Sequence, residues 1–453
     1  MTSFRFIHTA DLHLDTPFVG MSGIGDRLRR HLQESTFAAF GALVDLAISE
    51  EVDFIVISGD VYDASDSSLR AQLRLKEAWD KLGAHGIPVY VIHGNHDPLN
   101  SSRQRFSYPD HVTVFGPKVG SETAVRRRDG LPVAVVSGIS YPTSSVTENT
   151  SLRFHRDPDS SLYHIAMLHG NVDGQEGHDV YSPCTLSDLK KSGFDYWALG
   201  HIHKRQVLSE SPWVVYPGNI QGRSMKETGP KGCYIVDVNE NKEATLHFYE
   251  LDVVRWTETV LNIEHMASEE QCKDLLEESL EALRAGSEGR TTLVRLHFTG
   301  RGPMHSMLQS GRESTELLQE LQRKENERLA AGSAGAAFEL DSVVWPTDFK
   351  INTDMDYDIA LLLEENSFLG ELLRLSARSQ NRDEGPASDN TPEPSETMDA
   401  IIDQALAPLM EHRVLRGYLK ELSGKERQEI LQQAGEMAIS LLLDEETKGG
   451  EVS

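Results

Sequence analysis

The sequence is poor in cysteine and contains no long hydrophobic run. Its 453 residues include three cysteines, which lie far apart and form no Cys-x-x-Cys pair. This spacing offers no sulfur cage for a metal and is typical of reduced thiols. Because Asp11 comes before any long apolar stretch could form, we expect neither a signal peptide nor a membrane span. The sequence therefore predicts a soluble, cytoplasmic protein that does not associate with membranes.

Positive charge is also scarce. The formal net charge of −27 repels polyanions and argues against a general nucleic-acid-coating protein. The acidity is uneven, because residues 1–250 hold 24 Lys+Arg and 31 Asp+Glu, and the excess of acidic residues is larger beyond them. Two short clusters, Arg27 to Arg30 and Arg126 to Arg128, could contact phosphates, although short charge runs more often face water.

Apolar strands and amphipathic helices alternate up to about residue 250. Residues 4–10, 53–60 and 88–94 read as strands. Helical spacing of apolar residues occurs between them, from Leu32 to Leu46 and from Leu75 to Leu82. Such alternation indicates an α/β core, and the later strands with short turns indicate a partly antiparallel or mixed sheet. These later strands are expected at residues 131–140, 163–170, 194–201, 213–218 and 231–238.

The chain beyond residue 250 has a different pattern. Strands at 254–263, 291–300 and 336–345 alternate with helices at 268–286 and 306–330, which predicts a second α+β domain. A Pro-, Ser- and Glu-rich stretch then predicts a linker. Two helices follow the linker, and their apolar stripe either packs on the protein itself or binds a partner. We therefore expect a first domain at 1–250, a capping domain at 251–350, a helical segment at 351–376, a linker at 377–397 and C-terminal helices at 398–453.

Polar residues follow five of the predicted strands, at the point where each strand ends. Ligands of open α/β sheets collect beyond the carboxyl ends of the strands. Residues two apart in extended chain point the same way, so each Asp-x-His or His-x-His pair can reach a common centre. Nitrogen and oxygen donors without sulfur suit manganese, iron or zinc, and their number suits two ions sharing a carboxylate. The five segments contribute Asp11 and His13; Asp60 and Asp63; Asn95, His96 and Asp97; His169; and His201 and His203.

A single histidine at a strand end is weak evidence for a metal. A half-buried imidazole is often simply hydrogen-bonded, and this explanation suffices for His8, His93, His164 and His178. It does not account for five metal-type segments on five strand ends. We therefore predict that the five segments converge on one site.

The order of these motifs resembles that of the calcineurin-like metallophosphoesterases. The shared signature comprises Asp-x-His, Gly-Asp, Gly-Asn-His-Asp, His-Gly and Gly-His-x-His. The stretches HTADLHLD, SGDVYDAS and YPGNIQGRSMKETGPKGCYIVDV resemble the SbcD-like DNA repair exonucleases, in the YhaO-like branch. The resemblance is strong over residues 3–250 and weaker over 251–345. It implies an α/β fold with a metallophosphoesterase β-sandwich flanked by helices in α-β-β-α layers, a smaller α+β capping domain and C-terminal helices.

The resemblance also implies a role for each site residue. Asp63 and Asp97 are expected to orient imidazoles or to close turns, and Gly94 to let the backbone bend tightly. His93 is expected to be scaffolding. By resemblance, Asp11, His13 and His203 bind one ion, Asn95, His169 and His201 bind the other, and Asp60 bridges them. His96 binds neither ion and helps to protonate the leaving oxygen or to stabilise the transition state.

The activity implied by the resemblance is that of a manganese-dependent DNA exonuclease. It would digest DNA 3′ to 5′ with some single-strand endonuclease activity, as a homodimer working in DNA repair with an SbcC-like coiled-coil ATPase. Iron or zinc could replace manganese. Two alternatives stay open: a phosphodiesterase for nucleotides or other small phosphoesters, since one fold serves many substrates, and a non-catalytic adaptor subunit.

Overall fold

The structure is a computed structural model. It describes residues 2–18, 23–63, 68–100, 107–174, 181–331, 342–355, 364 and 370. The predicted linker and C-terminal helices lie outside the described residues, as does most of the predicted helical segment 351–376. The chain divides into two compact units, one of residues 1–259, 278–296 and 317–348, the other of residues 260–277, 297–316 and 349–453. The five domain ranges given above stay a prediction.

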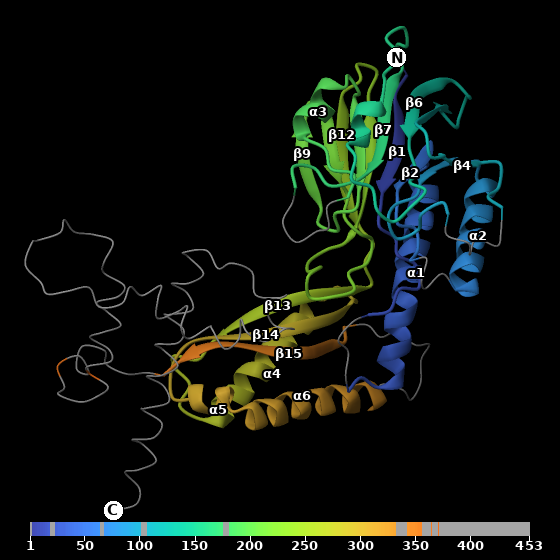
Figure 1. The fold of residues 1–453 in the computed structure, drawn as a ribbon. Coiled ribbons are helices and arrows are strands. Elements are labelled where there is room, and N and C mark those ends of the chain that lie inside the picture. The colour runs from blue at the N-terminus through green and yellow to red at the C-terminus, as the bar shows by residue number, and fades with distance from the viewer. Residues whose placement is uncertain are drawn as a thin grey trace, which may run out of the picture. The chain divides into compact units, whose positions relative to one another are not determined.

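The first unit contains two six-stranded sheets, and the first of them is mixed (Figure 1). Its strand order is β12-β11-β1-β2-β3-β4. The strands β1 to β4 run parallel to one another, whereas β11 is antiparallel to both β1 and β12. The mixed sheet predicted from the sequence is therefore confirmed. The bounds are β1 Phe4–Thr9, β2 Phe54–Ser58, β3 Val89–Ile92, β4 Val112–Val114, β11 Gly232–Val238 and β12 Ala244–Glu250.

Two long helices cover the outer face of this sheet. They are α1 (Asp26–Ser49) and α2 (Leu69–Ala84), and both follow a parallel strand as crossover connections require. Ile7 and Ile55 of the sheet pack against Phe40 and Trp79 of the helices in one buried cluster. This burial explains why β2 and β3 are nearly continuous apolar runs rather than alternating ones.

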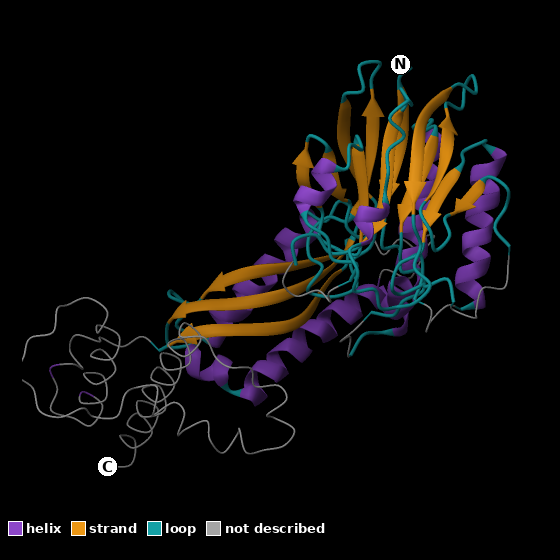
Figure 2. Ribbon diagram, turned by 45° about the horizontal axis from the view of Figure 1, so that its top comes forward, coloured by secondary structure: helices purple, strands orange, loops and turns teal. Residues whose placement is uncertain are grey.

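The second sheet faces the first across an aromatic core. Phe6 of β1 stacks on Phe54 of β2 at 5.2 Å and meets Tyr196 of the second sheet edge-on at 5.4 Å. The outer face of the second sheet buries Trp197 against Leu189 of helix α3 (Leu186–Lys191). The α-β-β-α layering implied by the resemblance is thus confirmed (Figure 2). The strand order is β5-β6-β7-β8-β10-β9, with β5 Gly120–Val125, β6 Pro132–Gly138, β7 Tyr163–His169, β8 Tyr196–Gly200, β9 Gln206–Glu210 and β10 Trp213–Tyr216.

The sequence predicted every inner strand of the two sheets and none of their edge strands. The edges are β4, β12, β5 and β9. Strand β4 has only three residues, and the other three edge strands are largely exposed or half-buried. Edge strands commonly carry polar residues, which discourage pairing with other chains, so they lack the apolar run on which the prediction depends.

A third sheet has the order β13-β14-β15. Its elements follow the predicted strand and helix order, except that the predicted helix 306–330 breaks at Ser310 into α5 and α6. The last strand was predicted at 336–345, and residues 336–341 of it lie outside the described residues. Strand β15 begins at Val344 and continues through residues 351–354, so the helix expected over those four residues is wrong. Pairing in the sheet sets this strand, and its polar sequence gave no such signal. The bounds are β13 Val254–Asn262, α4 Glu269–Ala285, β14 Thr291–Arg301, α5 His305–Gln309, α6 Gly311–Ala331 and β15 Val344–Asp354.

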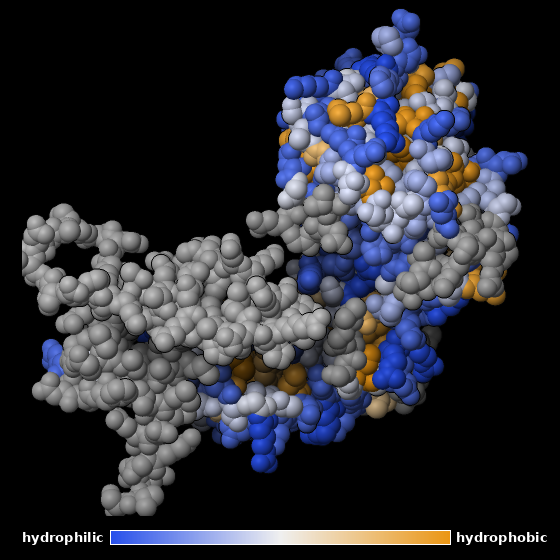
Figure 3. All heavy atoms as spheres, viewed as in Figure 1, coloured by the Kyte–Doolittle hydropathy of each residue, from blue (hydrophilic) through white to orange (hydrophobic). Residues whose placement is uncertain are grey.

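None of the described helices combines the length and the apolarity that a membrane span requires. On the face drawn in Figure 3, apolar side chains are interspersed with polar ones. Scattered exposed apolar residues of this kind are normal for folded proteins.

Candidate metal centre

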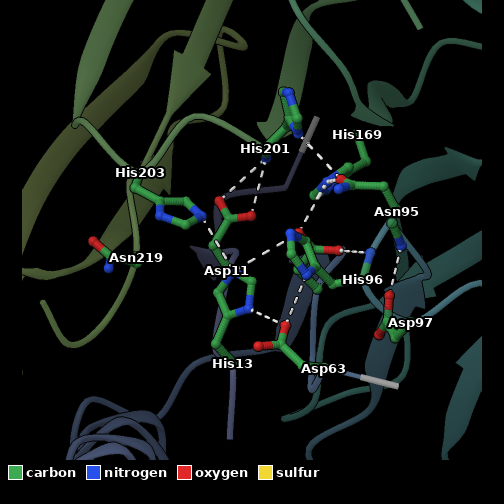
Figure 4. Close-up of polar contacts among 12 residues, drawn as sticks. Asp11, His13, Asp63, Asn95, His96, Asp97, His169, His201, His203 and Asn219 are labelled. Carbon is green, nitrogen blue, oxygen red and sulfur yellow. Dashed lines mark hydrogen bonds and ion pairs between the residues drawn. The ribbon is translucent and has the colours of Figure 1, made fainter. Parts of the chain in front are cut away.

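The five polar segments lie together at one end of the two sheets. Asp11 follows β1, Asp60 follows β2 and Asn95 follows β3, and the parallel direction of these strands brings their carboxyl ends to the same edge. From the second sheet, His169 ends β7 and His201 comes directly after β8, which are also parallel neighbours. Figure 4 shows the side chains of Asp11, Asn95, His169 and His201 pointing toward one another, together with those of His13, His96 and His203.

Unusual backbone conformations aim several of these side chains. Asp11, His13, Asp60 and His201 have positive φ angles of 52°, 42°, 51° and 94°. Non-glycine residues rarely adopt this left-handed region, and residues held there cluster at functional sites. Hydrogen bonds fix the turns, since the Asp11 amide donates to the Gly59 carbonyl oxygen at 3.1 Å and the His13 amide to the Asp60 carbonyl oxygen at 3.0 Å.

Asp11, His13 and His203 form one group of candidate ligands. Their donor atoms all lie within 4.8 Å of one another. The Nε2 atoms of His13 and His203 are 3.1 Å apart, while each Nδ1 faces a carboxylate. His13 Nδ1 lies 2.8 Å from Asp63 Oδ1, and His203 Nδ1 lies 2.6 Å from Glu227 Oε1. A carboxylate on Nδ1 holds an imidazole with Nε2 available to a metal.

Asn95, His169 and His201 form a second group. The Asn95 side-chain oxygen is 3.0 Å from His169 Nε2 and 3.2 Å from His201 Nδ1. His169 Nδ1 lies 2.8 Å from the Ser58 carbonyl oxygen, which fixes the ring and leaves Nε2 toward the centre. The His201 amide lies 3.1 Å from Asp11 Oδ1, so Asp11 also links the two groups.

Asp60 lies between the two groups. Its Oδ2 is 3.3 Å from His169 Nε2 and 3.7 Å from His13 Nε2. That oxygen is buried and has no hydrogen-bond partner among the residues that the structure describes. Burial alone would raise the pKa of Asp60, but His169 and His13 lower it below its ordinary value. A buried carboxylate oxygen without a hydrogen bond is costly, and a cation would satisfy it.

These observations show that the residues present fit a centre of divalent cations. Asp11, Asp60 and His169 are a second set whose donor atoms lie within 4.8 Å of one another. The donors are nitrogen and oxygen only, as the sequence predicted, and this chemistry suits manganese, iron or zinc. All seven predicted ligand residues are brought together, and their assignment to particular ions is a proposal taken up below.

His96 lies beside this cluster and differs from its neighbours in exposure. Its side chain is 48% exposed, whereas Asp60 is buried. His96 Nδ1 lies 3.0 Å from Asp63 Oδ1, and the His96 amide donates to Asp60 Oδ1 at 3.0 Å. The hydrogen bond that His96 Nδ1 donates to Asp63 raises the pKa of His96 above its ordinary value. Asp63 therefore orients two imidazoles at once, those of His13 and His96.

The turn after β3 is held by Asp97. Its two carboxylate oxygens accept hydrogen bonds from the Gly94 amide at 2.7 Å and from the Val61 amide at 2.9 Å. The buried His93 lies 2.8 Å from the Asp97 carbonyl oxygen through Nδ1 and 3.3 Å from the Tyr108 hydroxyl through Nε2. These contacts are those of a structural histidine and a turn-closing aspartate.

The reason expected for Gly94 was wrong. Its φ angle is not positive, so the turn does not require the conformational freedom of glycine. A Cβ atom at this position would instead overlap Asp60 Oδ1 and lie 2.6 Å from His169 Nε2. Gly94 is therefore needed for the close approach of two candidate ligands.

Sequence reasoning missed three residues of the loop between β10 and β11. Glu227 contacts His203, as described above. The Lys231 ammonium donates to the His203 carbonyl oxygen at 3.0 Å, and Arg223 lies near both Glu227 and Asp63. These three residues are spaced four apart in a glycine-rich loop, and this spacing does not predict a role at the site. The conformation of the loop decides where their side chains point.

The two arginine clusters have structural contacts. Arg126 is buried, pairs with Asp129 and lies 3.3 Å from the Ser3 carbonyl oxygen, at the end of β1 opposite the metal centre. Arg27 donates to the Leu329 carbonyl oxygen at 2.7 Å. These contacts favour the interpretation of both clusters as ordinary parts of the folded surface.

Comparisons with known proteins agree with this geometry. Residues 4–205 match the calcineurin-like phosphoesterase family, and residues 256–354 match the middle domain of the metallophosphoesterase YhaO. The chain is 36% identical to YhaO of Bacillus subtilis over 96% of its own length and 97% of that protein.

More distant relatives are DNA double-strand break repair proteins named Mre11. The protein from Thermoplasma acidophilum is 28% identical over 61% of this chain and 74% of its own length. The protein from Sulfurisphaera tokodaii is 24% identical over 59% of this chain and 68% of its own length. From the family match, the full-length similarity to YhaO and the converged donor set, the chain belongs to the calcineurin-like metallophosphoesterases.

Proposed function

We propose that this metallophosphoesterase is a two-metal phosphodiesterase that degrades DNA as a manganese-dependent exonuclease. The observation that carries the proposal is Asp60, a buried carboxylate with an unsatisfied oxygen between two groups of candidate ligands. A shared carboxylate is the expected bridge of a two-ion site, and two-ion sites suit displacement at phosphorus.

Each ligand group would hold one ion. When bound, the ions supply Lewis-acid stabilisation of the phosphoryl oxygens and a nucleophile at neutral pH. The protein's part is to fix the donor atoms, and Asp63, Glu227 and the Ser58 carbonyl oxygen do so by orienting three imidazoles. The assignment is Asp11, His13 and His203 for one ion, Asn95, His169 and His201 for the other, and Asp60 as the bridge.

His96 would act on the leaving group. Its ring is half-exposed beside the candidate centre, and its Nδ1 contact with Asp63 leaves Nε2 to meet a substrate oxygen. Asp63 raises the pKa of His96, which favours the protonated ring needed to donate a proton to a departing alkoxide.

DNA is the proposed substrate because the Mre11 relatives are named as DNA double-strand break repair proteins. By the resemblance described above, digestion would run 3′ to 5′ with some endonuclease activity on single strands. We further propose a homodimer that works with an SbcC-like coiled-coil ATPase. Residues 398–453, which lie outside the described residues, are the proposed docking element, since a helix laid in a partner's groove is a common recognition mode.

The test is digestion of end-labelled single- and double-stranded DNA with manganese, by the unaltered protein beside His96→Ala. A chromogenic phosphodiester is run in parallel. We expect the unaltered protein to shorten DNA from its 3′ ends and His96→Ala to lose nearly all activity. Cleavage of the chromogenic ester with intact DNA would favour a small-phosphoester enzyme, and no turnover of either substrate would favour an adaptor.

A further inference from the structure

The loop between β10 and β11 brings charged groups to the candidate metal centre that the proposed roles do not use. Glu227 anchors this loop, because its Oε1 lies 2.6 Å from His203 Nδ1 and its Oε2 accepts the backbone amide of Arg223 at 2.6 Å. The side chain of Arg223 is thereby fixed beside the cluster rather than projected into solvent.

The guanidinium of Arg223 lies between two carboxylates. Its Nη1 is 3.8 Å from Asp63 Oδ2, and its Nη2 is 3.6 Å from Glu227 Oε1. These are the carboxylates that orient the candidate ligands His13 and His203. Asp63 also contacts His96, so one carboxylate lies next to both the guanidinium and the proposed proton donor.

Both carboxylates already have shorter contacts with other groups. Asp63 Oδ1 is shared by His13 at 2.8 Å and His96 at 3.0 Å, and Asp63 Oδ2 accepts from the Thr16 hydroxyl at 2.8 Å. Glu227 is likewise committed to His203 and to a backbone amide. The two ion pairs of Arg223 exceed hydrogen-bond length and provide charge balance without saturating its donors.

The side chain of Arg223 is nevertheless mostly buried. It is 13% exposed, and its Nε is buried without a hydrogen-bond partner. None of its guanidinium nitrogens makes a hydrogen bond to the part of the chain that the structure describes. Buried donors without partners are costly, and such groups in native structures call for a ligand or another functional reason.

We propose that Arg223 binds the non-bridging oxygens of the substrate's phosphoryl group. This inference rests on the proposed function and adds to it a residue for phosphate recognition. A guanidinium presents two parallel N–H groups that match two phosphoryl oxygens, which an ammonium group cannot do. The chemical class of ligand is an anionic phosphoryl group with two free oxygens.

The test measures the affinity of the manganese-loaded, full-length protein for inorganic phosphate by calorimetry. We compare the unaltered protein with Arg223→Gln and Arg223→Lys, and with Arg128→Ala as a matched control, because Arg128 is exposed near the Arg126–Asp129 pair. Arg223→Gln should weaken phosphate binding about tenfold or more, and Arg223→Lys should weaken it less. Manganese content and the thermal midpoint should stay unchanged in Arg128→Ala and in Arg223→Lys.

The outcomes separate this inference from the proposed function. Equal phosphate affinity in the unaltered protein and in folded Arg223→Lys and Arg223→Gln would overturn it, as would the absence of phosphate binding by the unaltered protein. If Arg223→Gln does not fold, the comparison with Arg223→Lys decides alone. If the Arg223 variants lose phosphate affinity but the unaltered protein leaves DNA intact, the phosphate site stands and the nuclease is refuted. If the unaltered protein digests DNA but the Arg223 variants keep their phosphate affinity, the nuclease stands and the phosphate site is refuted.

Discussion

At the scale of single residues, the candidate centre depends on strain as much as on side-chain chemistry. Left-handed backbone at Asp11, His13, Asp60 and His201 costs about 1–3 kcal/mol per residue. The fold holds these residues in place through turn hydrogen bonds and close packing at Gly94. Bound cations would offset part of this cost, since they would satisfy the Asp60 oxygen that makes no hydrogen bond within the described residues.

Substitution of Glu227 tests whether a residue that contacts a candidate ligand, without binding metal itself, affects metal affinity. We expect Glu227→Gln to lower manganese affinity about 10- to 100-fold, because the amide orients His203 without the charge that makes the imidazole a stronger donor. Titration calorimetry with manganese measures this, with Glu148→Gln as the control because Glu148 is 72% exposed. Unchanged affinity in Glu227→Gln would show that the contact with His203 does not matter for binding.

Substitution of His96 tests whether metal binding and proton transfer depend on different residues. Since we assign no metal to His96, His96→Asn should retain full manganese content while turnover of a chromogenic phosphodiester falls about 10²- to 10⁴-fold. Metal analysis and steady-state kinetics on the same preparation provide both numbers. Loss of one ion in this variant would instead make His96 a ligand.

Much of the site at this scale could be predicted from the sequence, and the rest could not for identifiable reasons. Asp11, His13 and His96 lie in short motifs whose residue types and spacing indicate their chemistry. The partners Arg223 and Glu227 lie 20 and 24 residues beyond His203, the end of the last ligand motif, and a loop conformation brings them back. The role of Gly94 was predicted wrongly because the lack of a Cβ atom can either allow unusual backbone angles or make room for neighbouring side chains, and the sequence does not distinguish the two.

At the scale of elements, most inner strands lead directly into a residue of the candidate centre, and the other inner strands pair with these. Strands β1, β2 and β3 carry Asp11, Asp60 and Asn95 at their carboxyl ends, and β7 and β8 carry His169 and His201. The inner strands were predictable because burial on both faces makes them apolar. The edge strands were not, because they are exposed and carry no candidate ligand.

The aromatic core between the sheets should therefore support both stability and metal binding. Phe6 is fully buried and stacks on Phe54, so Phe6→Ala should cost about 3–5 kcal/mol of unfolding free energy. Urea unfolding of the metal-free protein measures this, with Leu152→Ala as the control because Leu152 is 64% exposed. Equal midpoints for the two variants would contradict the packing described here.

At the scale of the whole molecule, the fold class and family were predicted and are confirmed, whereas partners stay proposals. The net charge of −27 and the buried Asp11 and Asp60 together mean that a divalent cation relieves repulsion in the folded state. The proposed docking helices at 398–453 lie outside the described residues.

Removal of metal should accordingly destabilise the protein. A ligand at 100 times its dissociation constant stabilises the folded state by about 2.7 kcal/mol, so chelation should lower the thermal midpoint and manganese should restore it. Scanning calorimetry before and after chelation measures the shift. Asp60→Asn serves as the comparison, and its midpoint should respond much less to manganese.

The central claim is that two ions share Asp60 at the carboxyl ends of β1, β2 and β3. Anomalous diffraction from crystals of the full-length protein soaked in manganese tests it most directly. We predict two peaks, one beside Asp11, His13 and His203 and one beside Asn95, His169 and His201, with Asp60 touching both. A single peak, or peaks away from Asp60, would contradict the two-metal centre.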